Sequence, residues 1–374
     1  MAPGFSSSSG SEPRGAQAHG HAPAPHFRAS ASLPDDRFQD APVCWGLSIG
    51  VAGMLSQMRG VAQSAGFRFE PKKTRLKRGW HWLPLSLVPT RMSVVRDADT
   101  LDSRLPPPLI ITCGRHSVIP AICLKERWGA RTFVVFVQNP LVDPANFDLV
   151  IAPEHDGVTG DNVINTRGAL HHVTPELLAT ARDSDAGREL QRPGQPVVTV
   201  LLGGPNRCYG FSKPDIARLI DKLRMVVQRD NARLIIVSSR RTPEPVRARF
   251  VEEFSDHYVW DPARENPYLA ALAVADAIVV TCDSVSMTSE AAATGRPVFI
   301  EPLTERFPAP RFRRFQDSFR HAGITRRFEG RLEHWTYTPP DDAARIGRII
   351  REEMGLPPNH SSSISQACPA TVAR

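Results

Sequence analysis

The sequence lacks the short motifs that identify several large enzyme classes. It contains no H-E-x-x-H motif, no G-x-S-x-G motif and no Walker-type loop, which excludes the usual metalloprotease, serine-hydrolase and P-loop sites. No apolar run approaches the roughly 18 residues of a membrane-spanning helix, so we expect no integral membrane segment. The six cysteines form no C-x-x-C pair. They are expected to be buried free thiols in a reducing compartment, the cytoplasm.

What is present is an ordinary globular composition with a basic balance. Of 374 residues, 41% are hydrophobic and 23% are charged, and the net charge is +7. This length predicts about two domains. The positive charge permits nucleotides, phospholipid surfaces or nucleic acid as partners and selects none of them.

Composition divides the chain into two α/β halves between two tails. The first tail is rich in Ser, Gly, Ala, Pro and His and has no contiguous apolar segment, so we expect it to be disordered and not a secretory signal. The expected parts are a disordered tail (1–41), a Rossmann-like domain (42–182), a linker (183–196), a second Rossmann-like domain (197–330), a C-terminal helix region (331–356) and a mobile tail (357–374).

Each half opens with an apolar strand that runs into a glycine-bearing turn. The expected strands are residues 43–47, 109–113, 132–137 and 148–151 in the first half, and 197–202, 233–237, 277–281 and 298–300 in the second. Near-continuous apolar strands separated by helices predict parallel sheets covered on both faces. We therefore predict an α/β fold of two doubly wound domains facing a cleft, with ligands at the carboxyl ends of the strands.

The segment from Ala277 to Ile300 is the most informative. Its first strand ends in a polar turn, and the following helix stops at Gly295 and Pro297. The start of such a helix suits a diphosphate, and Glu290, on the same helix face as Ser286, suits the ribose hydroxyl groups. The alternative is that the serines only cap the helix. The residues assigned to this site are Asp283, Ser284, Ser286, Met287 and Glu290.

Two other turns in the second half are expected to contribute. Gly203 and Gly204 would let backbone amides approach a phosphate, and Arg207 would neutralise it; the alternative is a tight turn with an exposed arginine. Asn266, just before a helix, would read the edge of a nucleobase or cap that helix, and both roles are compatible.

Two strand ends carry further polar residues. Ser239, Arg240 and Arg241 directly follow the strand 233–237 and predict an anion site, with a solvated charge run as the alternative. In the first half, His116 follows the strand 109–113 and is a candidate general base for a hydroxyl acceptor. A lone histidine is more often structural.

A cationic and aromatic segment lies between the first two strand–helix units. Cations beside interfacial aromatic residues suit an anionic membrane surface. The same mixture would suit phosphate-backbone contacts with base stacking, or the tryptophans would simply fill the core. We expect the membrane surface and no nucleic acid. The residues concerned are Lys72, Lys73, Arg75, Lys77, Arg78, Trp80 and Trp82.

Together these motifs resemble the family of the plant mitochondrial-fission factor, the elongated-mitochondria protein, and its bacterial relatives. The resemblance covers about Val43 to Arg327. It rests on Gln57, Trp82-Leu83-Pro84, Gln138-Asn139-Pro140, His155-Asp156-Gly157, Gly203-Gly204-Pro205, Ser238, Arg240-Arg241-Thr242-Pro243, Asn266-Pro267-Tyr268, Thr281, Asp283-Ser284-Val285-Ser286-Met287 and Glu290-Ala291.

That family in turn resembles the GT-B glycosyltransferases, such as the peptidoglycan-synthesis N-acetylglucosaminyltransferase. The resemblance implies an inverting, metal-independent transferase at the cytoplasmic face of the inner membrane. Its donor would be a nucleotide sugar, UDP-linked by expectation, and no other cofactor is implied. The turn from Gly114 to Ser117 would lie on the acceptor side.

One departure from that enzyme favours a different class. Its first loop carries a histidine thought to act as base, whereas the loop from Ser48 to Gly53 has none, and the family's usual Asp-Gly start of this loop is altered. The alternative is a non-catalytic GT-B scaffold that recruits partner proteins to a membrane. A nucleotide-sugar epimerase is a third possibility, although no G-x-G-x-x-G follows Leu47.

Overall fold

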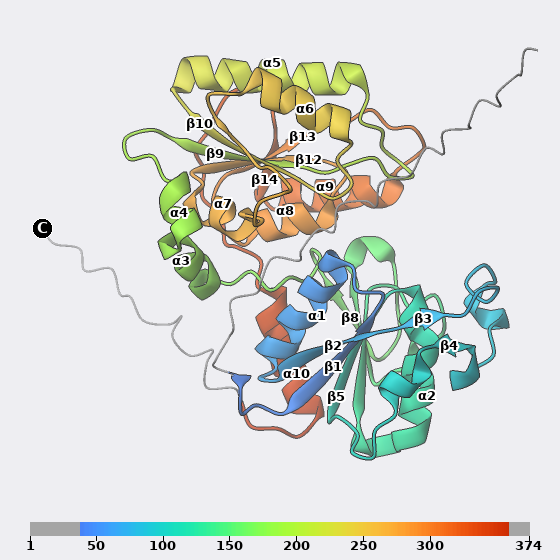
Figure 1. Cartoon of the computed structure of the whole chain (residues 1–374). Coiled ribbons are helices and arrows are strands. Elements are labelled where there is room, and N and C mark those ends of the chain that lie inside the picture. Colours follow the sequence, from blue (N-terminus) through green and yellow to red (C-terminus); the bar gives the residue numbers. More distant parts are fainter. Residues whose placement is uncertain (1–37, 359–374) are drawn as a thin grey trace, which may run out of the picture.

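Two six-stranded parallel sheets form the centre of the molecule, one in each half of the chain, the first below and the second above in Figure 1. The structure is a computed structural model and describes residues 38–358. The two expected tails, 1–41 and 357–374, lie almost entirely outside the described residues. The predicted α/β fold of two Rossmann-like domains is confirmed.

The first sheet contains all of the strands predicted in the first half, with two more at its edges. Val43–Ser48 and Leu109–Cys113 are neighbours in this sheet. Their neighbours are parallel throughout. The spatial order is β2 (Arg68–Lys73), β1 (Val43–Ser48), β5 (Leu109–Cys113), β6 (Phe133–Val137), β7 (Leu149–Pro153) and β8 (Val163–Thr166). A separate antiparallel pair joins β3 (Arg75–Leu76) to β4 (Val95–Arg96).

The second sheet has the strand order of a dinucleotide-binding domain. Numbered within this half, its strands run 3-2-1-4-5-6, and the order reverses between β9 and β12. Ligands of such sheets bind at this switch point, beyond the carboxyl ends of the strands. The strands are β11 (Tyr258–Val259), β10 (Arg233–Ser238), β9 (Val197–Leu202), β12 (Ala277–Thr281), β13 (Val298–Glu301) and β14 (Thr325–Arg327).

Helices cover both faces of each sheet, as the fully apolar strands require. On the first sheet, α2 (Val118–Trp128) covers one face, and α1 (Ala52–Ser64) with α10 (Asp342–Glu353) covers the other. On the second sheet, α5 (Lys213–Asp230) and α6 (Glu244–Glu253) pack opposite α7 (Tyr268–Val274) and α8 (Val285–Ala292). Helix α9 (Pro310–His321) completes this half. No helix among residues 38–358 is long and apolar enough to cross a membrane.

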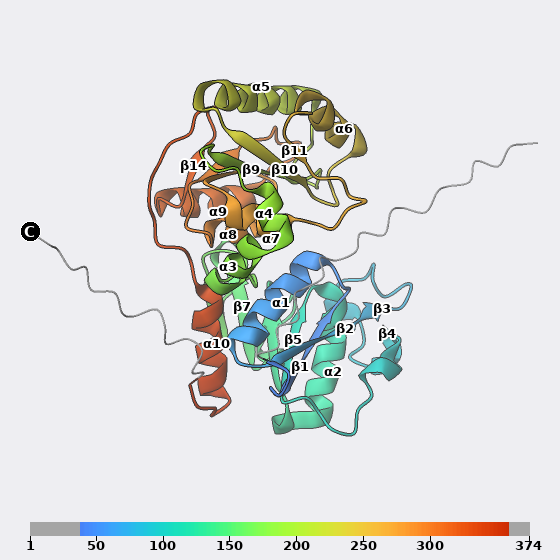
Figure 2. The ribbon, with the colours of Figure 1, turned by 60° about the vertical axis from the view of Figure 1, so that its left-hand side comes forward.

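The two halves exchange helices at their borders. Helix α3 (Pro175–Asp183) falls within the range expected for the first domain, but it packs against α7 of the second. Helix α4 (Asp185–Leu190) occupies part of the expected linker 183–196 and packs against α7 as well. In return, α10 crosses back and packs against α1, as both views show (Figures 1 and 2). The halves are therefore joined by two chain crossings.

Candidate functional site

The predicted site residues of the second half gather around the switch point of its sheet. Gly203 follows β9 and Asp283 follows β12, and these two strands are neighbours. Across the junction, helix α1 begins close to the start of α8: a Cβ atom built on Gly53 would lie 3.8 Å from Oγ of Ser286. The N-termini of two helices, both favourable to an anion, thus approach each other between the halves.

Glu290 lies at the centre of this junction. Its Oε2 accepts a hydrogen bond from the hydroxyl of Tyr268 at 2.6 Å, and its Oε1 accepts one from Oγ of Ser56 at 3.1 Å. The side chain is buried, and burial raises the pKa of this carboxyl, while the two hydroxyl donors act in the opposite direction. Two hydroxyl groups therefore satisfy one buried carboxylate, and they come from different halves of the chain.

Ser56 also contacts His172, on the first chain crossing. Oγ of Ser56 lies 2.8 Å from Nδ1 of His172. Because the one hydroxyl proton of Ser56 goes to Glu290, Nδ1 of His172 carries the proton of this second bond. Burial, and then Arg59, lowers the pKa of His172 to about 4. The ring is therefore neutral near pH 7, and the array runs from His172 through Ser56 to Glu290.

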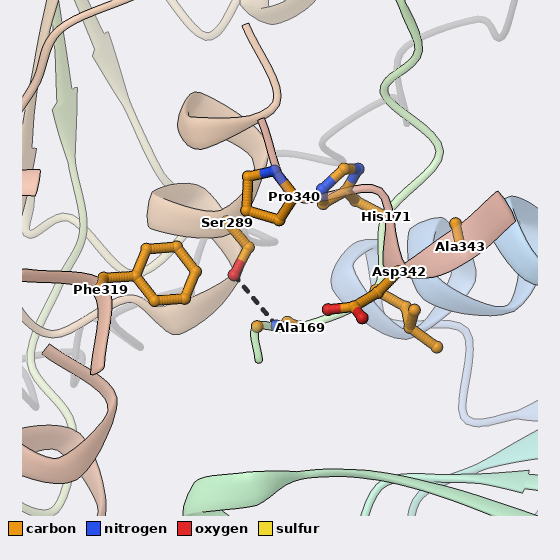
Figure 3. Close-up of a pocket in the computed structure, with 9 residues that line it drawn as sticks. Ala169, His171, Ser289, Phe319, Pro340, Asp342 and Ala343 are labelled. Atoms are coloured by element: carbon orange, nitrogen blue, oxygen red, sulfur yellow. Dashed lines mark hydrogen bonds between the residues drawn. The ribbon is translucent and has the colours of Figure 1, made fainter. Parts of the chain in front are cut away.

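The adjoining turn of α8 fixes the junction from the other side. Ser289 accepts a hydrogen bond from the backbone N–H of Ala169 at 3.0 Å, as Figure 3 shows. Phe319 and Pro340 line the cavity beside this bond. The cavity holds about 10 Å³, which is the space of one water molecule. It is not a nucleotide site.

The glycine turn after β9 is closed by protein groups. Gly204 donates its N–H to Oδ2 of Asp283 at 3.0 Å, and Nη2 of Arg241 reaches the same oxygen at 2.9 Å. A Cβ atom on Gly203 would lie 2.2 Å from the Asp283 carboxylate. Glycine is therefore required here by the close approach of Asp283. In this conformation the Gly204 amide and the Asp283–Arg241 pair are engaged with each other.

Other predicted cations remain available to an anion. Arg207 and Arg240 are exposed, and neither forms an ion pair with another residue of the described range. Ser239 instead supports its own turn: Oγ accepts the N–H of Arg241 at 3.2 Å, and its backbone N–H donates to Oγ1 of Thr242 at 2.9 Å. The turn after β10 is therefore held by its own hydrogen bonds, and it presents the guanidinium of Arg240 to solvent.

The capping alternative is realised for Ser284 but not for Asn266. Oγ of Ser284 accepts the backbone N–H of Met287 at 3.3 Å, and Ser284 is the N-cap of α8. Oδ1 of Asn266 accepts the N–H of Tyr268 at 3.0 Å, although Pro267, and not Asn266, is the N-cap of α7. Met287 packs against the core of the second half. Asn266 thereby orients the helix whose first residue, Tyr268, binds Glu290.

His116 lies under the cationic segment of the first half. Its Nδ1 accepts the backbone N–H of Leu76 at 3.2 Å. Burial lowers the pKa of His116, and Arg75, His81 and Arg115 lower it further. Because Nδ1 is occupied as an acceptor, the neutral ring carries its proton on Nε2 and has no free lone pair for a substrate proton. A general base there requires the bond to Leu76 to break.

The cationic segment itself divides into packed and exposed residues. Trp80 is half-buried against the core of the first half, and Lys72 lies 2.6 Å from Glu70 and 4.7 Å from the ring centre of Trp45. Trp80 and Lys72 therefore make contacts within the first half. Trp82 is 81% exposed.

Two motifs outside the predicted site also meet at the junction region. Nε2 of Gln138 donates to Oε1 of Gln57 at 3.1 Å, so the loop after β6 is tied to α1. Asp156 pairs with Arg311 of α9, Nη2 to Oδ2 being 3.2 Å, which links the halves. Among residues 38–358 there is no cluster of three or more His, Cys, Asp or Glu side chains suited to a metal ion.

Three contacting residues were missed from the sequence: Ser56, His172 and Tyr268. Tyr268 stands in the motif with Asn266, and its place in the first turn of a helix was visible. Ser56 and His172 carry no local signal, because Ser56 lies 116 residues from His172 and 234 residues from Glu290. Only the packing of the halves brings them together.

Two doubly wound α/β domains, joined by two chain crossings of which the second carries the C-terminal helix back to the first domain, form a GT-B-like fold. Among solved structures, the UDP-GlcNAc 2-epimerase of Methanocaldococcus jannaschii, in complex with UDP-GlcNAc and UDP, is similar, with a TM-score of 0.50 at 11% sequence identity. The match covers 83% of this chain and 98% of that one. At this identity it supports the fold alone.

The chain belongs to the mitochondrial fission ELM1 family, whose sequence profile matches residues 52–354. The mitochondrial fission protein ELM1 of Arabidopsis thaliana is 31% identical over 277 residues, 66% of this chain and 64% of that protein. An uncharacterized protein of Rickettsia prowazekii (strain Madrid E) is 30% identical over 292 residues, 68% of this chain and 81% of that protein. The chain thus spans less than two thirds of the Arabidopsis relative. The resemblance to the family is confirmed.

Proposed function

We propose that the chain binds a nucleotide sugar at the junction of α1 and α8 and acts as a GT-B-type glycosyltransferase. The observation that supports this proposal best is the pair of hydroxyl groups on the Glu290 carboxylate. A ribose presents two neighbouring hydroxyl groups and would replace those of Ser56 and Tyr268 with the same hydrogen-bond chemistry.

The energetics of Glu290 support a ligand role over a purely structural one. A carboxylate buried between domains costs free energy even when two hydroxyl groups satisfy it, and burial raises its pKa. An apolar residue or a glutamine would hold the junction at lower cost. The charged group is therefore better explained by an interaction that is made only when ligand is bound.

The diphosphate would lie between the helix N-termini at Gly53 and Ser286. Exposed Arg207 and Arg240, at the ends of β9 and β10, would neutralise its charge, so transfer would need no metal ion. Departure of the nucleotide diphosphate is the step that these cations and amides would favour. The proposal leaves the acceptor base unassigned, because Nδ1 of His116 is already occupied.

The test is calorimetric titration of the full chain with UDP, GDP, CMP and ADP, followed by the sugar conjugates of the nucleotide that binds. Glu290→Gln should weaken binding at least about tenfold, because a hydrogen bond to a charged group is worth about 1.5–3 kcal/mol. Ser56→Ala should strengthen it about fivefold, because a hydroxyl worth about 1 kcal/mol no longer competes with the ribose.

The matched control is Glu253→Gln, since Glu253 lies on α6 and pairs with Arg224. It should leave the affinity unchanged. Saturable binding that Glu290→Gln abolishes supports the site. Failure of all four nucleotides to bind the parent chain, or equal binding by Glu290→Gln and Glu253→Gln, would contradict it.

A non-catalytic scaffold that recruits partner proteins to a membrane is the second candidate. The closed glycine turn favours it, because the Gly204 amide and Arg241 are engaged with Asp283. The two candidates separate in one assay: release of free nucleotide from the bound conjugate in the presence of membrane acceptors. Binding without release over a donor panel supports the scaffold.

A further inference from the structure

The chain contains a long stretch without any acidic residue. Between Glu70 and Asp97 there is no aspartate or glutamate, whereas the same stretch carries seven cations: Lys72, Lys73, Arg75, Lys77, Arg78, Arg91 and Arg96. In the structure this stretch holds the small β3–β4 pair and the loop between them. Both views place it on the outer side of the first half, away from α10 (Figures 1 and 2).

Large apolar side chains in this loop face solvent. Trp82 is 81% exposed, Leu87 64% and Leu83 38%. The loop is nevertheless anchored, because Leu85 and Val88 are buried in the core of the first half. Arg115 also donates to the backbone carbonyl of Leu83. The buried neighbours therefore hold the exposed apolar residues toward solvent, where contact with water is unfavourable for apolar side chains.

Cations surround these apolar side chains. Lys73, Arg75, Lys77, Arg78 and Arg91 are exposed, and none of them pairs with an acidic group of the described residues. Lys72 and Arg96 do have such partners, Glu70 and Asp97. The loop from Lys73 to Arg91, called here the cationic loop, therefore combines unpaired positive charge with protruding apolar groups.

We propose that the cationic loop docks on the surface of an anionic lipid membrane. Trp82, Leu83 and Leu87 enter the boundary between headgroups and acyl chains, where a tryptophan ring is favoured. The cations bind the lipid phosphates. The docking does not depend on the nucleotide site, because Glu290 lies at the junction between the halves and no residue of the loop contacts it directly in the structure.

Charge alone would also suit single-stranded nucleic acid, but the apolar groups favour lipid. Binding of a single strand relies on aromatic faces on which successive bases stack. Here one of the three exposed apolar residues is aromatic, and the other two are leucines, which offer no stacking face. Trp80 is packed against the core and cannot supply a second ring.

The experiment is co-sedimentation of the full chain with vesicles of phosphatidylcholine, with and without phosphatidylglycerol. The parent chain should bind only the anionic vesicles, and less strongly at about 1 M salt, where the Debye length is about 3 Å. Lys77→Gln with Arg78→Gln should weaken binding about 25-fold, at about fivefold for each cation lost. Trp82→Ser with Leu87→Ser should weaken it at least about tenfold.

The control variant is Leu105→Ser, an equally exposed leucine (83%) that precedes β5 outside the loop. It should bind like the parent, and all variants should show unchanged thermal melting because the altered residues are exposed. Absence of binding to anionic vesicles would overturn the proposal. So would unchanged binding by both double variants, or stronger binding to a single-stranded oligonucleotide than to the vesicles.

Discussion

Helix α1 lies so close to the backbone of the first chain crossing that residue 60 must be a glycine, and this makes a sharp test of the junction. A Cβ atom on Gly60 would lie 2.1 Å from the carbonyl oxygen of His171, 2.6 Å from its carbonyl carbon and 3.1 Å from the nitrogen of His172. All three atoms belong to the backbone, so no side-chain rotation relieves the contact. Gly60→Ala must push α1 and the crossing apart by about 1.3 Å to reach ordinary contact distance.

The cost follows from that displacement. Overpacking of this kind costs about 1–3 kcal/mol, and loss of the bond between Ser56 and His172 adds about 1 kcal/mol. The better helix propensity of alanine returns about 1 kcal/mol. We expect Gly60→Ala to lose about 1–3 kcal/mol of the free energy of unfolding.

Gly53→Ala is the matched control in the same helix. The nearest atom to its new Cβ would be Oγ of Ser286 at 3.8 Å, an ordinary contact, so this variant should gain about 0.4–1 kcal/mol. The two variants should differ by about 1.4–4 kcal/mol, and calorimetric melts should separate them by about 3–16 °C, at about 2–4 °C for each kcal/mol in a domain of about 150 residues. A Gly60→Ala protein that melts at or above Gly53→Ala would refute the described packing of α1.

Three further outcomes are expected. Burial raises the pKa of the Glu290 carboxyl, so its ionisation lowers the free energy of unfolding as the pH rises through that pKa. The Glu290→Gln variant should therefore melt about 2–4 °C above the parent at pH 8. At pH 4 the two proteins should melt at the same temperature. The buried ring of His155 has no hydrogen-bond partner within residues 38–358, and burial lowers its pKa to about 4. Stability should therefore fall as the pH drops from about 6.5 to 4, and His155→Phe should reduce that fall in urea titrations. Arg311→Gln removes the ion pair between half-exposed Arg311 and Asp156 and should cost about 1 kcal/mol, with faster hydrogen exchange in α9.

Much of the fold followed from local patterns. The strand ranges 109–113, 197–202 and 277–281 agree with β5, β9 and β12 residue for residue, because buried parallel strands leave an unbroken apolar run. The start of α5 also rests on local residues, since Ser212 caps it and Pro214 stands in its first turn.

The rest depends on contacts between distant parts of the chain. The sequence pattern of α10 predicts a helix but not where that helix packs. Its close packing against α1 requires a glycine at position 347, because a Cβ atom there would lie 2.4 Å from the backbone of Ser64. The residues Gly203 and Gly204 suggested a phosphate turn, yet the same glycines are required by the approach of Asp283 and Arg241. A glycine in the sequence therefore indicates that another group approaches the backbone closely, but it does not indicate whether that group is a ligand or part of the protein.

The junction couples the candidate site to the arrangement of the two halves. The chain passes between them twice, and the crossings touch, since the N–H of Arg167 donates to Oδ2 of Asp342 at 3.0 Å. Ser56 can bind Glu290 only while α1 rests against α8. A ligand that takes both oxygens of Glu290 must therefore displace α1, and any group that separates the halves must by the same amount favour that ligand. Ligand binding and the opening of the junction are then coupled, and each event favours the other by the same free energy.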